Sequence, residues 1–413
     1  MRSLYNLFCD CQKVSTDTRN IAPGSIFFAL RGASFDGNRF AGEALERGAA
    51  YAVVDNPEVA LDERYMVVDD TLTALQELAR EHRRALAIPI LAVAGSNGKT
   101  TTKELVSRVL ATRFTLFATR GNLNNHIGVP LTLLSMDRSV EFGVVEMGAS
   151  SCGEIARLCE IAEPNYGILT NIGRAHMEGF GGPEGIRRGK GELFDYLATH
   201  NGTAFYRAED NTLQSMVSER KGLKSHPYSE ERGANINHQL EGIYNRYNVA
   251  AAAAIGDFFA IEEAQINRAI GSYAPDNNRS QLTLTERNTL VVDCYNANPT
   301  SMQHAIAHLA SRALGERKRR ILILGDMREL GAWADEEHRQ IVEQAAAIAD
   351  AELWLVGELF GKAAEAVTAT AKIRCFTHCD ELCKALTDHP VSEALILIKG
   401  SHSIGLERTI AYL

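Results

Sequence analysis

Ile90-Leu-Ala-Val-Ala-Gly-Ser-Asn-Gly-Lys-Thr-Thr-Thr102 is the stretch that decides how the surrounding chain folds. It opens with an apolar run, turns through Gly95-Ser-Asn-Gly98, and continues into a segment with the apolar spacing of an amphipathic helix. We therefore expect a buried strand, a tight turn and a helix. Glycines let backbone N–H groups approach a polyphosphate, and the start of a helix adds partial positive charge. The turn is thus a candidate phosphate site.

Two side chains that follow the turn suit the same purpose. Lys99 can reach terminal phosphates, and the hydroxyl of Thr100 suits Mg²⁺. The spacing of the general P-loop is not met, because Val93 stands where its first glycine would fall. The shortened loop resembles the nucleotide loop of the Mur ligase family, ATP-dependent enzymes that extend the peptide of a cell-wall precursor. The resemblance implies ATP contacts from Gly95, Ser96, Asn97, Gly98, Lys99, Thr100 and Thr101.

Three further stretches resemble the family member that adds D-alanyl-D-alanine. They are Thr119-Arg-Gly-Asn-Leu-Asn-Asn-His-Ile-Gly-Val-Pro130, Asp293-Cys-Tyr-Asn-Ala-Asn-Pro299 and Leu324-Gly-Asp-Met-Arg-Glu-Leu-Gly331. The implied reaction uses ATP to turn the carboxylate of a UDP-N-acetylmuramoyl-tripeptide into an acyl phosphate, which the amine of D-alanyl-D-alanine attacks. Three alternatives stay open: the ligase that adds the third amino acid, folylpolyglutamate synthase, and a P-loop switch that hydrolyses ATP without ligation.

Length and composition limit the classes of protein. A chain of 413 residues predicts about three domains. With 43 Lys+Arg against 52 Asp+Glu and no long basic run, nucleic acid is not an expected partner. Asp10 interrupts any signal-peptide core, and no apolar segment approaches a membrane span, so we expect a cytoplasmic monomer without membrane insertion.

The eight cysteines fit reduced thiols better than a disulfide framework. Cys375, Cys379 and Cys383 lie near His378, but their spacing matches no common zinc site. Thr377 instead has the spacing of a helix cap, which predicts a strand end followed by a helix.

The fold class predicted from these patterns is α/β with three domains. Residues 1–84 read as a small α/β module ending in a helix over Thr71–Leu86, and the resemblance assigns it the UDP end of the substrate. Residues 85–280 alternate strands and helices, which predicts a P-loop mononucleotide-binding domain with a mainly parallel sheet. Residues 281–413 predict a Rossmann-like domain, to which the resemblance assigns the incoming dipeptide. This region lacks the Gly-x-Gly-x-x-Gly motif, so a dinucleotide is not implied.

Candidate metal ligands follow strand ends in the central region. Glu146 ends an apolar strand, where a carboxylate can hold Mg²⁺ between ATP phosphates. The resemblance adds a second Mg²⁺ at His176 and Lys190, a lysine that the family commonly carbamylates into an anionic oxygen donor. A plain ammonium that neutralises phosphate, beside Arg187 and Arg188, is the alternative for Lys190. The expected catalytic residues are Lys99, His176 and Lys190.

The remaining site residues come from the resemblance. Adenine contacts are expected from Asn245 and Asn248, and further ATP contacts from Arg279 and Asp293. Substrate contacts are expected from Asp17, Thr18, Arg19, Thr119, Asn122, Asn124, Asn125, Tyr295, Asn296, Asn298 and Asp326. Asp17, Thr18 and Arg19 also suit ordinary turn and capping roles. His338 matches a family position too, but a helical histidine is expected to be exposed. Asn38, His126 and His402 depart from the residues usual in the family.

Overall fold

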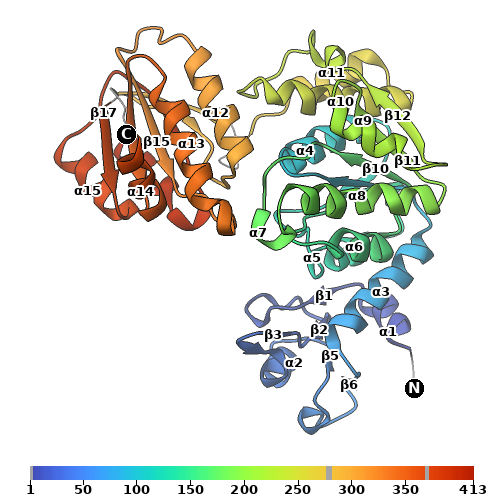
Figure 1. The fold of residues 1–413 in the computed structure, drawn as a ribbon. Helices are drawn as coiled ribbons and strands as arrows, with labels where there is room; N and C mark the ends of the chain where they lie inside the picture. Colours follow the sequence, from blue (N-terminus) through green and yellow to red (C-terminus); the bar gives the residue numbers. More distant parts are fainter. Residues whose placement is uncertain (1–2, 276–280, 368–371) are drawn as a thin grey trace.

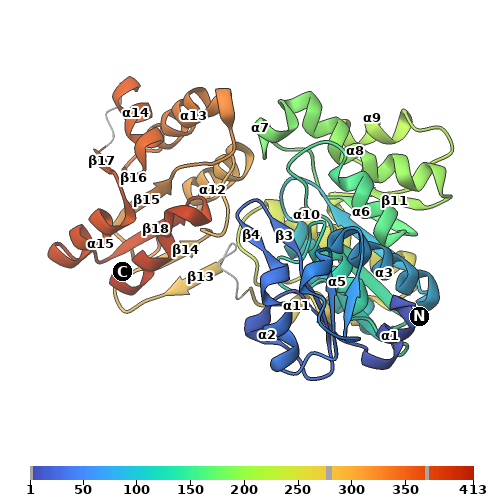
Figure 2. The same ribbon diagram turned by 90° about the horizontal axis from the view of Figure 1, so that it is seen from below.

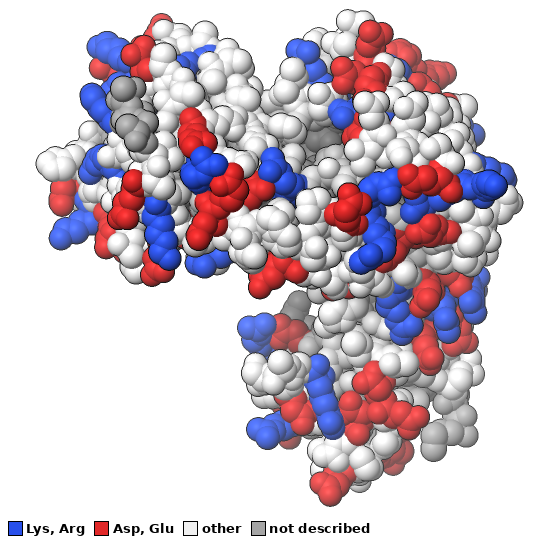
Figure 3. Space-filling model, viewed as in Figure 1, with Lys and Arg blue, Asp and Glu red and all other residues white. Residues whose placement is uncertain are grey.

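The computed structural model describes residues 3–275, 281–367 and 372–413, which form three lobes (Figure 1). The N-terminal lobe, in blue, lies below the central lobe, and the C-terminal lobe, in orange and red, lies beside it. The view from below again shows the C-terminal lobe set to one side (Figure 2). Acidic and basic side chains are interspersed over the face in Figure 3, which is hollowed between the central and C-terminal lobes. No helix in the described ranges has the length and apolar character needed to span a membrane.

The central lobe is organised around a six-stranded parallel sheet in the order β12-β11-β10-β7-β9-β8. Its strands are β7 (Ile90–Ala94), β8 (Leu116–Ala118), β9 (Phe142–Glu146), β10 (Tyr166–Leu169), β11 (Thr203–Arg207) and β12 (Lys224–Tyr228). Its helices are α4 (Lys99–Leu110), α5 (Gly128–Leu134), α6 (Glu154–Ala162), α7 (Met177–Phe180), α8 (Pro183–Thr199), α9 (Asn211–Ser218), α10 (Tyr244–Phe258) and α11 (Glu263–Gly271). The parallel sheet and the predicted strand, turn and helix at its centre are confirmed.

Strand β7 shows why this sheet is covered by helices on both faces. All five of its residues are fully buried. Leu91 and Val93 pack with apolar residues of α4, α10 and α11, whereas Ile90, Ala92 and Ala94 belong to the core that includes α5, α6 and α8. Successive side chains of a strand point to opposite faces, so a continuous apolar run is stable only where both faces are covered.

The N-terminal lobe holds four short parallel strands in the order β1-β2-β5-β6. Its strands are β1 (Val14–Ser15), β2 (Ile26–Phe28), β5 (Tyr51–Val54) and β6 (Tyr65–Val67), with a hairpin of β3 (Arg31–Gly32) and β4 (Phe35–Asp36). Its helices are α1 (Leu4–Cys11), α2 (Ala41–Glu46) and α3 (Thr71–Leu86), which has the bounds predicted from the sequence. Asp70 caps α3 by accepting from the N–H of Thr73 at 2.6 Å. Because α3 packs against α5 and α6, it joins the first two lobes.

The C-terminal lobe has a six-stranded sheet in the order β13-β14-β18-β15-β16-β17, parallel except for the β13–β14 pair. Its strands are β13 (Gln281–Leu284), β14 (Thr289–Val292), β15 (Arg319–Gly325), β16 (Ala351–Val356), β17 (Lys372–Phe376) and β18 (Ala394–Lys399). Its helices are α12 (Pro299–Ser311), α13 (Ala334–Ala346), α14 (Glu358–Ala366) and α15 (Cys379–Asp388). Helix α12 begins with a reciprocal capping box formed by Asn298 and Ser301.

Two local predictions in this lobe are wrong. The Thr377 side chain does not cap α15; the backbone N–H of Thr377 instead donates to Glu381 Oε2 at 2.7 Å. His378 takes the N-cap position of α15, and its side chain makes no capping hydrogen bond. His338 is fully buried rather than exposed, because it lies on the buried face of α13 together with Ile341 and Val342. Its Nε2 accepts from the N–H of Met327 at 3.0 Å. All eight cysteines are free thiols, as expected. The boundaries at 84 and 280 stay predictions, since α3 runs through the first and the second lies outside the described residues.

Candidate active site

The loop between β7 and α4 requires glycine at two positions. Gly95 has φ +132° and Gly98 has φ +77°, a region that favours glycine. A Cβ on Gly95 would lie 2.1 Å from Thr170 Oγ1, and one on Gly98 would lie 2.7 Å from Asn248 Oδ1. Both glycines are therefore fixed by close neighbours as well as by backbone conformation.

The segment that follows β10 holds the curvature of this loop. Thr170 Oγ1 donates to the carbonyl of Asn97 at 2.6 Å. The N–H of Ser96 donates to the carbonyl of Asn171 at 3.0 Å, and Ser96 Oγ donates to the carbonyl of Gly173 at 2.9 Å. The loop is thus shaped by protein contacts, which is the preorganisation that a phosphate site needs.

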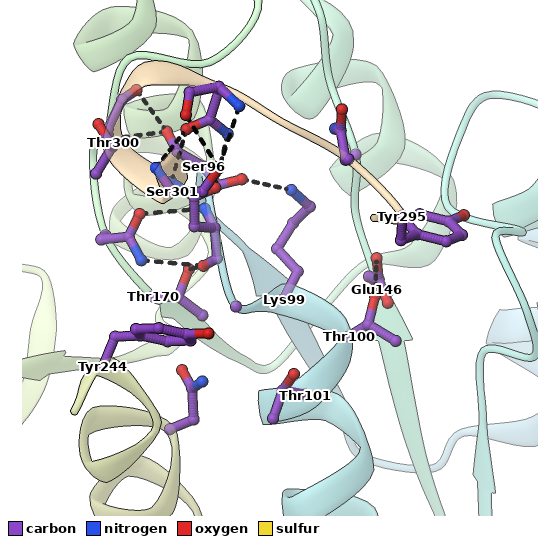
Figure 4. Close-up of a pocket in the computed structure, with 18 of the residues that line it drawn as sticks. Ser96, Lys99, Thr100, Thr101, Glu146, Thr170, Tyr244, Tyr295, Thr300 and Ser301 are labelled. Carbon is purple, nitrogen blue, oxygen red and sulfur yellow. Dashed lines mark hydrogen bonds between the residues drawn. The ribbon is translucent and has the colours of Figure 1, made fainter. Parts of the chain in front are cut away.

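Lys99, the first residue of α4, folds back over the loop (Figure 4). Its Nζ donates to the carbonyls of Gly95 at 3.0 Å and Ser96 at 3.1 Å. The ammonium therefore lies where the loop curves, beside the start of a helix that adds partial positive charge. This arrangement gives a polyanion a cation at the expected place.

Glu146 and Thr100 face each other at the carboxyl end of the sheet (Figure 4). Thr100 Oγ1 donates to Glu146 Oε1 at 3.2 Å, and Asn124 Nδ2 donates to the same oxygen at 2.9 Å. The other oxygen, Oε2, is buried without a hydrogen-bond partner among the described residues. Carboxylate and hydroxyl oxygens suit Mg²⁺, so these residues fit one ion. The described residues contain no cluster of three or more His, Cys, Asp or Glu able to hold a metal, so phosphate or water would complete the shell.

His176 lies at the boundary between the central and C-terminal lobes. It has φ +55°, and its Nδ1 contacts the carboxylate of Glu329. Burial lowers the pKa of His176, Glu329 opposes that effect, and Lys99 and Lys190 act in the same direction as burial. The neutral imidazole, the form that binds metals, is therefore favoured by its surroundings.

Lys190, on α8, is fully buried behind the wall of the site. Its Nζ donates to the carbonyl of Ala149 at 2.8 Å and lies 4.9 Å from the centroid of the Phe180 ring. Burial and then Lys99 hold the pKa of Lys190 well below its ordinary value, with Glu154 and Glu192 opposing. Burying an ammonium is costly without a compensating charge, so the neutral amine is favoured here.

The C-terminal lobe contacts the nucleotide loop through the start of α12. Asn298 Nδ2 donates to Asn97 Oδ1 at 2.7 Å, and the N–H of Arg174 donates to Thr300 Oγ1 at 3.0 Å. Arg174 also pairs with Glu337 of α13 at 2.7 Å. Between the two lobes lies a cavity of about 510 Å³, within the usual range for ligand pockets.

Comparison with known proteins decides the family. The UDP-N-acetylmuramoyl-tripeptide–D-alanyl-D-alanine ligase of Bacillus subtilis (strain 168) is 32% identical over 422 residues, covering 96% of this chain and 92% of that protein. The chain belongs to the Mur ligase family. The model for the Mur ligase family catalytic domain matches residues 11–83, that for the middle domain 93–241, and that for the glutamate ligase domain 278–402.

Other Mur ligases are similar to this chain over nearly its whole length. The Escherichia coli (strain K12) enzyme of the same name is 33% identical over 427 residues, covering 96% of this chain and 92% of that protein. A crystal structure of MurF from Acinetobacter baumannii has a TM-score of 0.85 at 28% identity, covering 97% of this chain and 93% of that one. MurF ligase from Thermotoga maritima in complex with ADP has a TM-score of 0.84 at 25% identity, covering 100% and 98%.

The cavity of this Mur ligase brings together most of the residues predicted for the site. Those that line it are Ser96, Asn97, Gly98, Lys99, Thr100, Thr101, Asn122, Asn124, Asn125, Glu146, His176, Asn245, Asn248, Asp293, Tyr295, Asn296 and Asn298. Gly95 supports the loop without lining the cavity, and Arg279 lies outside the described residues.

Two predicted substrate residues are engaged elsewhere. Asp326 is 2% exposed, and its carboxylate accepts from the N–H groups of Leu359 at 3.1 Å and Phe360 at 2.9 Å, at the start of α14. Thr119 is also 2% exposed, and its Oγ1 accepts from the N–H of Glu146 at 3.0 Å. In this structure both side chains support the backbone and neither lines the cavity, so a substrate contact from either stays a prediction.

Asp17, Thr18 and Arg19 lie in the N-terminal lobe, outside this cavity. Asp17 caps the short 3-10 helix Thr18–Asn20 by accepting from the N–H of Arg19 at 2.9 Å, and the two side chains form an ion pair at 2.7 Å. The exposed pair fits the turn and capping interpretation, and its contact with a UDP group stays a prediction.

Sequence reasoning missed an aromatic and basic corner of the cavity. Tyr244, Tyr247, Arg207 and His304 line it, and the guanidinium of Arg207 lies 3.8 Å from the centroid of the Tyr247 ring. Arg207 is the last residue of β11, so its place at the carboxyl end of a parallel strand was an available signal. His304 comes from α12, and no local pattern connects it to the central sheet.

Proposed function

We propose that this Mur ligase joins D-alanyl-D-alanine to a UDP-N-acetylmuramoyl-tripeptide with hydrolysis of ATP to ADP and phosphate, in peptidoglycan precursor synthesis. The observation that carries the proposal is the single cavity lined by the nucleotide loop, the Asn122–Asn125 segment and polar residues after β14. The relatives from Bacillus subtilis and Escherichia coli match this chain almost end to end. We take the proposed substrates from the names of these two enzymes.

The chemistry asks the protein mainly to position reactants and neutralise charge. A carboxylate is a poor electrophile, so transfer of the γ-phosphoryl group to it creates an acyl phosphate that an amine can attack. Lys99 would leave the loop carbonyls to bind phosphate oxygens, and the loop N–H groups would hold the rest of the chain of phosphates. No side-chain nucleophile takes part.

Thr100 and Glu146 would hold one Mg²⁺, which supplies charge neutralisation to the phosphates when bound. The second ion is assigned to His176 and a carbamylated Lys190. Carbon dioxide would add to the neutral Nζ with formation of an N–C bond and release of one proton. Support comes from the full burial of an amine whose hydrogen bond goes to a neutral carbonyl. A plain ammonium at Lys190 remains the alternative.

Lys190→Ala separates these two interpretations. A carbamate contributes anionic oxygens, so we expect the variant to be nearly inactive and partly rescued by acetate, with a carbon dioxide adduct in the mass of gently handled wild-type protein. An ammonium that binds phosphate predicts no rescue, because an added carboxylate worsens the electrostatics. No rescue together with no adduct would remove the carbamate from the proposal.

Phosphate release tests the function itself. We expect release only when ATP, a UDP-muramoyl-tripeptide and D-alanyl-D-alanine are all present, with Lys99→Ala as the inactive control. Release with ATP alone would indicate the switch, release that needs a UDP-muramoyl-dipeptide and a diamino acid would indicate the ligase of the preceding step, and release with folate and glutamate would indicate folylpolyglutamate synthase. We further propose the cytoplasm as its location and 1–84, 85–280 and 281–413 as its domains.

A further inference from the structure

The parallel ladder between β8 and β9 changes its partners at Thr119. Ala118 is paired with Val144, and the N–H of Thr119 donates to the carbonyl of Val144 at 3.0 Å. A regular parallel ladder would next join the Thr119 carbonyl to the N–H of Glu146. Instead, that N–H donates to the Thr119 hydroxyl at 3.0 Å. The side chain has replaced the backbone carbonyl as the acceptor.

The displaced carbonyl has a partner of its own. Lys103 Nζ donates to it at 2.7 Å and also pairs with Glu104 at 2.9 Å. The Lys103 side chain is 1% exposed and lies one turn after Thr100 on α4. A buried ammonium costs several kcal/mol unless it is paired and hydrogen-bonded, so this lysine is held by a specific arrangement.

This exchange lets the chain leave the sheet and return over the end of β9. The carbonyl of Asn124 accepts from the N–H of Gly148 at 2.7 Å, and its side-chain amide donates to Glu146 Oε1 at 2.9 Å. The approach is close, because a Cβ on Gly148 would lie 2.9 Å from Asn124 Oδ1. One end of Glu146 is therefore fixed by Thr119 at its backbone, and the carboxylate is fixed by Asn124.

We propose that Lys103 and Thr119 are positioning residues that aim the Glu146 carboxylate at the metal–nucleotide site. The inference rests on the proposed function, because it assumes that Glu146 and Thr100 hold Mg²⁺ together with a nucleotide. Neither residue lines the cavity. The Thr119 hydroxyl takes the place of the Thr119 carbonyl as acceptor for the N–H of Glu146. Lys103 stabilises that carbonyl, which is turned out of the ladder. The chain that follows then places the Asn124 side chain against the Glu146 carboxylate.

The test measures binding of ADP by calorimetry, with and without Mg²⁺, in wild type, Thr119→Val, Thr119→Ser and Lys103→Met. Partners of metal ligands typically change metal affinity by about 10–100-fold. We expect Thr119→Val and Lys103→Met to lose about tenfold or more of the affinity that Mg²⁺ adds, while metal-free ADP binds within about threefold of wild type. Thr119→Ser keeps the hydroxyl and should retain the Mg²⁺ effect.

Thr71→Val is the matched control, since Thr71 is 1% exposed and donates its hydroxyl to the carbonyl of Ala29 at 3.1 Å in the N-terminal lobe. It should keep the wild-type Mg²⁺ effect. If Thr119→Val and Lys103→Met, folded by circular dichroism, also keep it, the positioning role is overturned. If Thr119→Val does not fold, Lys103→Met and Thr119→Ser still decide, because equal Mg²⁺ effects in Lys103→Met and wild type overturn the role. A wild type whose ADP binding ignores Mg²⁺ would overturn the proposed metal site itself.

Discussion

Gly98→Ala should damage both the stability of the central lobe and the binding of nucleotide. Gly98 is the N-cap of α4 at φ +77°, and Gly153 is the N-cap of α6 at φ +88°. Alanine at either position adopts left-handed backbone at a cost of about 1–2 kcal/mol. The two sites differ in what the new Cβ meets: Asn248 Oδ1 at 2.7 Å from position 98, and nothing within 4 Å at position 153. Gly153→Ala is therefore a matched control for backbone strain.

The displaced Asn248 sets the size of the difference. Asn248 accepts from Thr102 Oγ1 at 3.1 Å and donates to Asn245 Oδ1 at 2.8 Å. Loss of these two bonds, at about 0.5–1.5 kcal/mol each, should make Gly98→Ala less stable than Gly153→Ala by about 1–3 kcal/mol. Urea unfolding measures that gap, and calorimetry with ADP should show weaker binding by Gly98→Ala alone. Equal stability and equal ADP affinity in the two variants would refute the reasoning.

Three shorter predictions concern the loop and the boundary between the lobes. Lys99→Ala should lower turnover by about 10²-fold or more while the variant still folds, because it removes a charge-stabilising contact and leaves no cavity. Near-normal turnover of the folded variant would contradict its role. Asn298→Ser keeps the helix cap, but its shorter side chain cannot reach Asn97. This variant should unfold like wild type, while its affinity for ADP falls about fivefold, the equivalent of about 1 kcal/mol. Asn298→Ala also lacks the cap and should therefore lose stability as well. The hydrogen bond from His308 lowers the pKa of Glu241 below its usual 4.5, burial opposes this effect, and Arg312 adds to the lowering. Ionised Glu241 therefore stabilises the folded protein above about pH 4.5, and this contribution is lost as pH falls through the folded pKa. The difference in thermal midpoint between wild type and Glu241→Gln should be present at pH 7 and shrink below about pH 4.5, and a difference that grew as pH fell below 4.5 would contradict this sign.

Features set by local sequence were predictable. The apolar run Ile90–Ala94, the spacing of Leu75 and Leu78 in α3, and the Asn298-Pro299 start of α12 each contain their own signal, and the structure confirms the elements. The residues that follow β7, β9 and β10 also line one cavity, because parallel strands bring those ends to the same edge of the central sheet.

Features set by neighbours distant in sequence were not predictable in the same way. The burial of His338 is an exception that the sequence did indicate. His338 precedes Ile341 and Val342 by three and four residues, so it shares their buried helix face. Thr119 had none, because its position in the Asn-rich motif does not reveal that its hydroxyl replaces a ladder carbonyl. The direction of the Asp326 carboxylate likewise depends on where α14 begins, which the residues around Asp326 do not encode.

Helix α12 connects the two ends of the cavity. Asn298 at its start bonds to Asn97 of the nucleotide loop, while His308 and Arg312 at its other end both contact Glu241, just before α10. Between them, the His304 ring stacks on Tyr244, with centroids 5.9 Å apart. The helix has 13 residues, so at about 1.5 Å per residue these contacts span roughly 20 Å. One rigid element therefore contacts both the loop expected to bind phosphate and the start of the helix expected to bind adenine. Because α12 belongs to the C-terminal lobe, any change in how that lobe docks must alter both ends of the nucleotide site together.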